Sequence, residues 1–210
     1  MTIRAVVFDM DGVLIDAREW HYEALNRALG LFGMEISRFD HLVTYDGLPT
    51  KVKLEMISRE RQLPRSLHSF LNDLKQQYTH ELIVQHCRPV FQHEYALSRL
   101  KLEGYRLGLA SNAIRSTIQE MIERASLGHY FDVVLSNGDV VNAKPDPEIY
   151  LRAIDMLGLE PYEVLVVEDN EKGVKAASEA GAHVVQVSGP TDVTYERIKT
   201  EITRTVGVAA

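Results

Sequence analysis

The chain has 210 residues, of which 45% are hydrophobic, and its formal net charge at pH 7 is −7. This composition is typical of a globular protein with one domain, or with one core and a modest insertion. The acidic balance argues against nucleic acid and anionic membranes as main partners, because both attract basic proteins. The single cysteine, Cys87, cannot form an internal disulfide, and no apolar run approaches the roughly 20 residues that span a bilayer. We therefore expect a soluble cytoplasmic protein in which Cys87 is a structural thiol.

Five compact apolar runs predict β-strands at residues 3–8, 105–110, 132–136, 163–167 and 182–187. Such runs are typical of parallel strands that are covered on both faces. Helical patterns alternate with them over residues 91–210, which predicts an α/β fold with a doubly wound, Rossmann-like and mostly parallel sheet.

Residues 16–90 break this alternation, because they carry three helical patterns and no convincing strand. We therefore expect a discontinuous α/β core domain made of residues 1–15 and 91–210. The helical insertion of residues 16–90 forms a second domain, here called the cap.

Polar and charged residues follow four of the predicted strands at their carboxyl ends. In strand order they are Asp9 and Asp11, then Ser111 and Asn112, then Lys144, and finally Glu168 and Asp169. Each group alone is consistent with a structural role in a turn, a helix cap or a solvated loop. Ligands of open parallel sheets, however, bind just beyond the carboxyl ends of the strands. Together these residues predict one functional site at that edge.

The charge at this edge predicts a bound divalent cation. Two carboxylates about 4 Å apart repel each other by about 4 kcal/mol at an effective dielectric constant near 20. A cation and the Lys144 ammonium would offset most of the repulsion among four carboxylates. Mg²⁺ fits best, because it prefers carboxylate and carbonyl oxygens and commonly works beside phosphates. No cluster of His or Cys with zinc spacing competes for this role.

Four segments, "FDMDGVLID", "SNA", "KPDPEIY" and "VVEDNEKGVKAA", follow one another in the order of the four motifs of the haloacid dehalogenase (HAD) superfamily. The chain resembles in particular the β-phosphoglucomutase-like and phosphoglycolate-phosphatase-like members, which carry a helical cap after the first motif. The resemblance covers essentially the whole chain. It implies a Mg²⁺-dependent phosphatase that hydrolyses a small phosphate monoester, a sugar phosphate in particular, through an aspartyl-phosphate.

The resemblance assigns the two aspartates of the first motif to catalysis. Asp9 is the nucleophile and also binds the metal. Asp11 is the general acid that protonates the leaving oxygen and then the general base that activates water, and its backbone carbonyl faces the metal. Dehalogenases and phosphonate-cleaving relatives lack this second aspartate, so its presence favours cleavage of an oxygen ester.

The other motif residues bind the phosphate and the metal in this resemblance. Ser111, through its hydroxyl, and Asn112, through its backbone amide, hold phosphate oxygens. Lys144 neutralises charge on the phosphate and on Asp9. Asp169 binds Mg²⁺ directly, and Glu168 binds it directly or through water.

The cap residues do not identify the substrate, and they leave open whether water or a sugar hydroxyl accepts the phosphoryl group. His21 corresponds to a histidine at the cap entrance of β-phosphoglucomutases. It either helps to close the cap, contacts substrate or lies on a helix surface. Thr50, with Lys51 beside it, stands where those mutases carry an arginine for a second phosphate, which favours a phosphatase over the alternative of a sugar phosphomutase. A non-enzymatic protein with this fold is a third reading, disfavoured by the intact motif residues. We expect a small phosphate ester as the binding partner, and a monomer or weak dimer.

Overall fold

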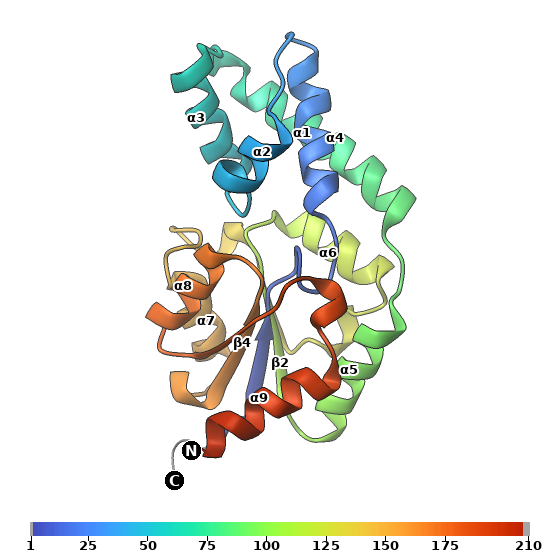
Figure 1. Cartoon of the computed structure of the whole chain (residues 1–210), viewed down its shortest axis with the longest axis vertical. Helices are drawn as coiled ribbons and strands as arrows, with labels where there is room; N and C mark the ends of the chain where they lie inside the picture. Colours follow the sequence, from blue (N-terminus) through green and yellow to red (C-terminus); the bar gives the residue numbers. More distant parts are fainter. Residues whose placement is uncertain (1, 208–210) are drawn as a thin grey trace. The chain divides into compact units, whose positions relative to one another are not determined.

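The computed structural model describes residues 2–207 and contains a five-stranded parallel sheet (Figure 1). The strand order is β3-β2-β1-β4-β5, so the first strand of the chain lies in the centre. The strands are β1 (Ala5–Phe8), β2 (Arg106–Ala110), β3 (Val133–Leu135), β4 (Val164–Glu168) and β5 (His183–Gln186). Each strand overlaps one of the five apolar runs, and the predicted doubly wound parallel sheet is confirmed.

The central strand is buried on both faces, as its uninterrupted apolar sequence predicts. All four residues of β1 are 0% exposed. Side chains alternate along a strand, and Ala5 and Val7 accordingly belong to the core that includes residues of α7 (Glu148–Met156) and α8 (Glu171–Glu179). Val6 and Phe8 point to the opposite face of the sheet.

Helices cover the sheet and connect its strands. Besides α7 and α8, the helices that follow β1 in this unit are α5 (Phe91–Leu102), α6 (Arg115–Arg124) and α9 (Tyr195–Gly207). Helices α5 and α9 contact each other, and they also contact β2 and β5, respectively. None of the helices within residues 2–207 is long and apolar enough to cross a membrane.

The chain divides into two compact units. The sheet unit joins the described residues up to Asp16 to those from Arg88 onward, and residues 17–87 form the second unit. The sequence pattern predicts domain boundaries at 15/16 and 90/91. Every regular element of residues 17–87 is helical, as expected. The helices are α1 (Arg18–Gly30), α2 (Arg38–Asp40), α3 (Thr50–Arg61) and α4 (His68–His86), with a π-helical turn at His41–Tyr45.

The helical unit has an apolar core of its own. Helices α1 and α4 make its most extensive helix contact. The fully buried side chains of this core include Leu25, Leu29, Ile36, Tyr45, Leu54, Ile57 and Leu71. Burial of such side chains contributes roughly 1.5–3 kcal/mol each to folding. The helices of this unit are therefore held together by their own packing.

The register of the sheet brings the carboxyl ends of its strands to one edge. Phe8, the last residue of β1, pairs with Leu109 of β2 and Val167 of β4. The backbone amide of Asp9 extends this ladder by donating to the Val167 carbonyl at 3.0 Å. The segments that carry the predicted site residues leave the sheet at this edge.

Candidate active site

A tight loop after β1 carries the two aspartates of the first motif. Gly12 has a φ of 83°, a left-handed conformation that costs glycine nothing because it has no Cβ. Its amide donates to the Ile15 carbonyl at 2.7 Å, and three further amides of the loop donate to the Met10 carbonyl. Asp9 is 8% exposed and Asp11 is half-buried. The loop thus fixes both aspartates at the end of the central strand.

Lys144 connects the ends of three strands. It comes from the segment between β3 and α7, is 5% exposed, and its ammonium donates three hydrogen bonds. Two of them, both at 2.7 Å, go to Asp9 Oδ1 and Glu168 Oε1. The third goes to the Ala110 carbonyl at the end of β2, at 2.8 Å. Such charge-assisted bonds are stronger than neutral ones, and they hold Lys144 between two buried carboxylates.

Asn112 holds the backbone of Lys144 in place. Its side-chain oxygen accepts a hydrogen bond from the Lys144 amide at 3.1 Å, and its side-chain nitrogen donates to the Lys144 carbonyl at 3.3 Å. This pairing uses the side chain of Asn112, whereas the sequence resemblance assigns a role to its backbone amide. Asn112 therefore positions the lysine of the neighbouring loop.

Ser111 lies at the end of β2 and is 1% exposed. Its amide donates to the Leu135 carbonyl of β3 at 3.1 Å, and its hydroxyl oxygen accepts from the Ala113 amide at 3.1 Å. The hydroxyl thus shapes its own turn, while its proton stays available as a donor. The structure places Ser111 at the same edge of the sheet as Asp9.

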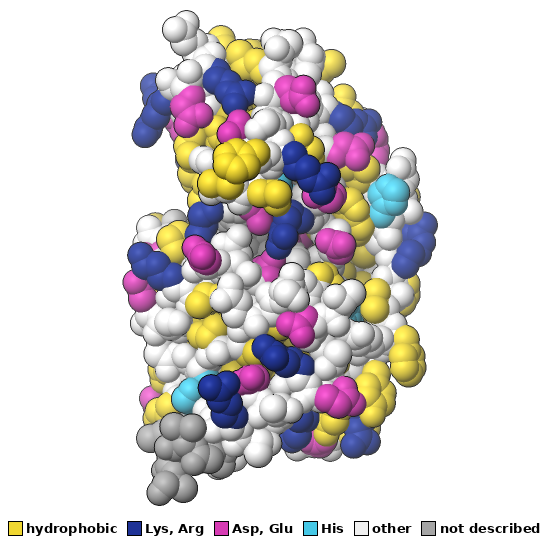
Figure 2. Space-filling model, viewed as in Figure 1, with side chains coloured by type: hydrophobic (Ala, Val, Ile, Leu, Met, Phe, Trp, Pro, Cys, Tyr) yellow, Lys and Arg dark blue, Asp and Glu magenta, His cyan; other side chains and the backbone are white. Residues whose placement is uncertain are grey.

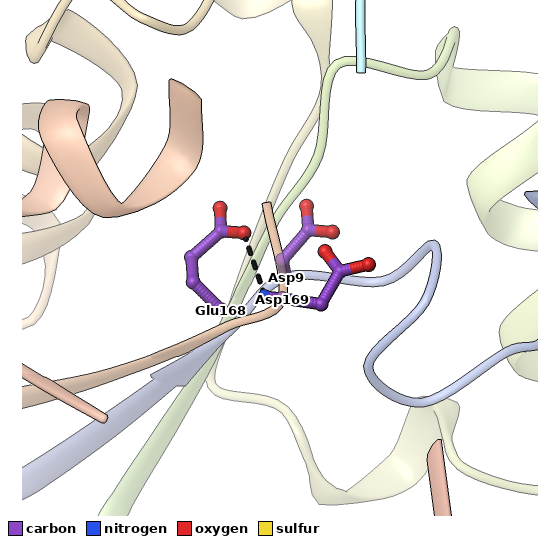
Figure 3. A group of neighbouring side chains, drawn as sticks. All are labelled: Asp9, Glu168 and Asp169. Atoms are coloured by element: carbon purple, nitrogen blue, oxygen red, sulfur yellow. Dashed lines mark hydrogen bonds between the residues drawn. The ribbon is translucent and has the colours of Figure 1, made fainter. Parts of the chain in front are cut away.

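Three carboxylates form a group that could hold a metal ion. One oxygen from each of Asp9, Glu168 and Asp169 lies within 4.8 Å of the others (Figure 3). The side chain of Asp11 does not belong to this group. Carboxylate oxygens are hard donors of the kind that Mg²⁺ prefers. The donor set therefore fits the metal that the sequence predicts.

The electrostatics of this group favour a bound cation. Burial raises the pKa of Asp9 well above its ordinary value, and the charges of Glu168, Asp11 and Asp169 raise it further, although Lys144 opposes this. Burial alone would lower the pKa of Lys144, but the charges of Asp9 and Glu168 more than offset that effect and hold it above its ordinary value. A divalent cation would add positive charge beside the three carboxylates and favour the ionised form of Asp9.

Glu168 is enclosed by residues of two helices. It is 1% exposed, and its Oε1 accepts a hydrogen bond from the Tyr150 hydroxyl of α7 at 2.5 Å as well as from Lys144. Its Oε2 accepts from the Asp169 amide at 3.2 Å (Figure 3). Gly173 of α8 leaves room for the carboxylate, because a Cβ at that position would lie 1.8 Å from Oε1. These neighbours restrict Glu168 to one orientation.

The sequence interpretation missed Tyr150 and Gly173. Tyr150 belongs to an apolar stripe of α7 and is easily taken for a core residue. A buried tyrosine hydroxyl normally needs a hydrogen-bond partner, which is the signal that points to a neighbouring polar group. For Gly173, the only sequence signal is a glycine two residues inside a helix that starts after the fourth motif.

The predicted cap residues lie in the helical unit and differ in their surroundings. His21 Nδ1 lies 3.2 Å from the ammonium of Lys75, which is 7% exposed. Thr50 is half-buried at the first position of α3, and Lys51, the next residue, is exposed. Lys53 is the buried lysine of this helix, at 7% exposure. The sequence interpretation did not single out Lys53 or Lys75.

A histidine near Lys53 is also buried. His41, in the π-helical turn, is 1% exposed and packs on the Tyr22 ring with 5.0 Å between the ring centroids. Burial, together with the positive charge of Lys53, lowers the pKa of His41 to about 4. This side chain is therefore neutral near pH 7.

Comparisons with known proteins agree on one family. A family model described as haloacid dehalogenase-like hydrolase matches residues 6–187. The chain is 33% identical over 182 residues to a phosphorylated carbohydrates phosphatase of Thermotoga maritima, an alignment that covers 85% of this chain and 82% of that protein. It is 30% identical over 205 residues to pyrophosphatase PpaX of Bacillus cereus, and this alignment covers 90% of this chain and 84% of that protein.

A solved structure extends the likeness to the fold. The β-phosphoglucomutase of Clostridium difficile matches with a TM-score of 0.85, over 98% of this chain and 100% of that one. The two sequences are 22% identical, so this match concerns the fold alone.

Proposed function

Because the chain belongs to the haloacid dehalogenase-like hydrolase family, we propose that it cleaves a small phosphate monoester through an aspartyl-phosphate on Asp9. The chain is a phosphatase of phosphorylated small molecules, as its curated relatives are. A sugar phosphate is the substrate class that we propose, since the Thermotoga relative is a phosphorylated carbohydrates phosphatase. The observation that carries the proposal is the buried Asp9 carboxylate held by Lys144 at 2.7 Å, next to Glu168 and Asp169.

In the first step of the proposed reaction, Asp9 attacks phosphorus. Its Oδ1 is engaged by Lys144, which leaves Oδ2 as the attacking oxygen. The bond from Oδ2 to phosphorus forms as the ester P–O bond breaks, and Asp11 gives its proton to the leaving oxygen. Lys144 offsets the charge that gathers on Asp9 and on the phosphate.

In the second step, water regenerates the enzyme. Asp11, now a carboxylate, takes a proton from a water molecule whose oxygen attacks phosphorus. The bond between phosphorus and Asp9 breaks, and inorganic phosphate leaves. The Ser111 hydroxyl and the Asn112 amide are the proposed contacts of the phosphate oxygens in both steps.

We propose that Asp9, Glu168, Asp169 and the backbone carbonyl of Asp11 hold Mg²⁺ in the active enzyme. When bound, the ion would offset negative charge on the phosphate and on Asp9. The group of three side chains described above supports this ligand set.

We further propose that cap residues recognise the remainder of the substrate. His21, Thr50 and Lys51 are the contacts that the sequence resemblance suggests.

The same fold serves β-phosphoglucomutases, so transfer of phosphate within a sugar is the second candidate function. The TM-score of 0.85 to one such mutase is the observation in its favour, and it concerns the fold alone. Thr50 lacks the guanidinium that binds phosphate with two hydrogen bonds. Water is therefore the proposed acceptor of the phosphoryl group.

We propose that the protein works in the cytoplasm on a soluble substrate, as a monomer or weak dimer, without nucleic acid or membrane partners. Its single cysteine supports a reducing compartment. On the face shown in Figure 2, Lys and Arg side chains are interspersed with acidic ones rather than gathered in one patch. Size-exclusion chromatography with light scattering tests the proposed oligomeric state.

A screen of phosphate esters tests the proposed function. The purified protein with Mg²⁺ is offered sugar phosphates, phosphoglycolate and pyrophosphate, and both released phosphate and rearranged sugar phosphates are measured. We expect net phosphate release from at least one sugar phosphate, without a bisphosphate activator. The variant Asp9→Asn is the control for contaminating phosphatases. Interconversion of two sugar phosphates with negligible phosphate release would favour the mutase. Faster hydrolysis of pyrophosphate than of any sugar phosphate would refute the proposed substrate class.

A further inference from the structure

Tyr150 places a hydroxyl on a carboxylate of the candidate metal group. The residue is 0% exposed in the middle of the sheet unit, and its hydroxyl donates to Glu168 Oε1 at 2.5 Å. The same oxygen accepts from Lys144 at 2.7 Å, and the Lys144 ammonium also lies 4.7 Å from the centroid of the Tyr150 ring. One side chain of α7 thus contacts both the carboxylate and the lysine that binds it.

We propose that Tyr150 is a positioning residue for phosphoryl transfer: its hydroxyl fixes Glu168 so that Oε2 stays available to Mg²⁺ and Lys144 stays shared with Asp9. The proposal deepens the proposed phosphatase function and presupposes it. Two donors saturate Oε1, so Oε2 is the oxygen with capacity left for a cation. Partners that orient a metal-binding carboxylate in this way commonly tune both metal affinity and activity.

Packing against α8 also restricts the Glu168 carboxylate. Gly173 lies so close that an added Cβ would meet the carboxylate, at 1.8 Å from Oε1. The carboxylate is therefore enclosed by α8, Tyr150 and Lys144. Without the hydroxyl, Oε1 keeps Lys144 as its donor, and we expect Glu168 to turn toward the lysine and away from the metal position.

The hydrogen bonds of Lys144 would change as well. Lys144 divides its hydrogen bonds between Glu168 and Asp9, at equal distances of 2.7 Å. Without the hydrogen bond from Tyr150, Glu168 would interact differently with Lys144. The bond from Lys144 to Asp9 would change in turn, and with it the position of the Asp9 carboxylate. Misplacement of a nucleophile lowers the rate of the chemical step more than it lowers substrate binding.

The variant Tyr150→Phe tests the proposal, because it removes the hydroxyl and keeps the ring that packs in the core. The matched control is Tyr162→Phe, which removes the hydroxyl of a tyrosine that is 46% exposed. Mg²⁺ affinity is measured by isothermal titration calorimetry without substrate, and kcat and KM are measured with the best ester from the screen. We expect about 10-fold weaker Mg²⁺ binding and about 10-fold lower kcat in Tyr150→Phe, with KM for the ester within twofold. Tyr162→Phe should match the wild type.

A second measurement separates positioning from general stabilisation. In the background of Glu168→Gln, the change Tyr150→Phe should add less than twofold to the loss of Mg²⁺ affinity, because both act through the same carboxylate. Independent, multiplying effects would overturn the proposal. A Tyr150→Phe protein that folds and binds Mg²⁺ as the wild type does would also overturn it, and so would one that does not fold, since the hydroxyl would then support the core as a whole.

Mg²⁺ affinity is measured without substrate, so this result does not depend on whether the protein is a phosphatase. If no ester is hydrolysed by the wild type, the phosphatase assignment fails, while the effect of Tyr150 on Mg²⁺ affinity is still measured. If the wild type is active and Tyr150→Phe keeps normal affinity and normal kcat, the role of Tyr150 alone is refuted.

Discussion

Replacement of Lys144 by methionine tests whether its charge balances the buried carboxylates of the site. Methionine keeps most of the apolar stem and removes the ammonium, which donates to Asp9, Glu168 and the Ala110 carbonyl at 2.7–2.8 Å. The attraction between unit charges 2.7 Å apart is about 6 kcal/mol at an effective dielectric constant near 20. Much of it is offset by the cost of burying the charges. Breaking such a buried pair costs about 3–5 kcal/mol, because it leaves carboxylates without their cation.

Urea unfolding in EDTA, followed by circular dichroism, measures this loss as a change in the free energy of unfolding. Lys101→Met is the matched control, because Lys101 also donates to a carboxylate, Asp132, at 2.7 and 2.9 Å, but the lysine side chain is 35% exposed. Exposed pairs contribute about 0–1 kcal/mol, so the control should lose no more than that. We also expect added Mg²⁺ to restore part of the stability of Lys144→Met, since the ion supplies positive charge to the same carboxylates. A loss for Lys144→Met no larger than that of the control would refute this reasoning.

Three further predictions concern the general acid, the metal and the cap. Asp11→Asn should lower kcat by about 10²–10⁴-fold, while its Mg²⁺ affinity, measured by calorimetry, stays within a few-fold of the wild type. Equal losses of kcat and Mg²⁺ affinity would contradict the assignment of Asp11 to proton transfer. EDTA should abolish phosphate release and lower the melting temperature, and Mg²⁺ should restore both. Ca²⁺ should restore the melting temperature only, because its larger coordination shell misplaces Asp9. Full activity in EDTA would refute the metal assignment. For His41, the pKa falls from its ordinary 6.5 in the unfolded chain to about 4 in the fold, mainly through burial. Between these values the unfolded chain binds more protons, so stability falls as the pH falls from 6.5 to 4. His41→Phe should remove on the order of 1–2 kcal/mol of this loss at pH 5, measured by urea unfolding at pH 5 and pH 7.5; an unchanged pH dependence would contradict the low pKa.

The strands and the edge that carries the site could be predicted from the sequence, because they depend on local signals. Residues 5–8, directly before Asp9, are all apolar and fully buried. Parallel strands end at the same edge, so residues such as Ser111 and Glu168 could be grouped without any knowledge of the packing.

The contacts between distant loops could not be predicted in this way. The Asn112 side chain pairs with the backbone of Lys144, 32 residues away, and this depends on how two loops meet. The burial of Lys53 depends on where α3 begins, since a shift by one residue turns each side chain of a helix by about 100°. Tyr150 follows an apolar pattern that a residue with a purely structural role would satisfy equally well.

The proposed mechanism requires that Asp9 carries the phosphoryl group during turnover. The most direct measurement is to mix the enzyme and Mg²⁺ with a hydrolysed ester, quench the reaction in acid within a single turnover, and map the phosphoryl group by peptide mass spectrometry. We predict that the peptide containing Asp9 gains one phosphoryl group, with the modification on Asp9 itself, and that a folded Asp9→Asn protein shows neither modification nor turnover. A phosphoryl group on another residue, or phosphate release by Asp9→Asn at a rate near that of the wild type, would refute the assignment of Asp9 as the nucleophile.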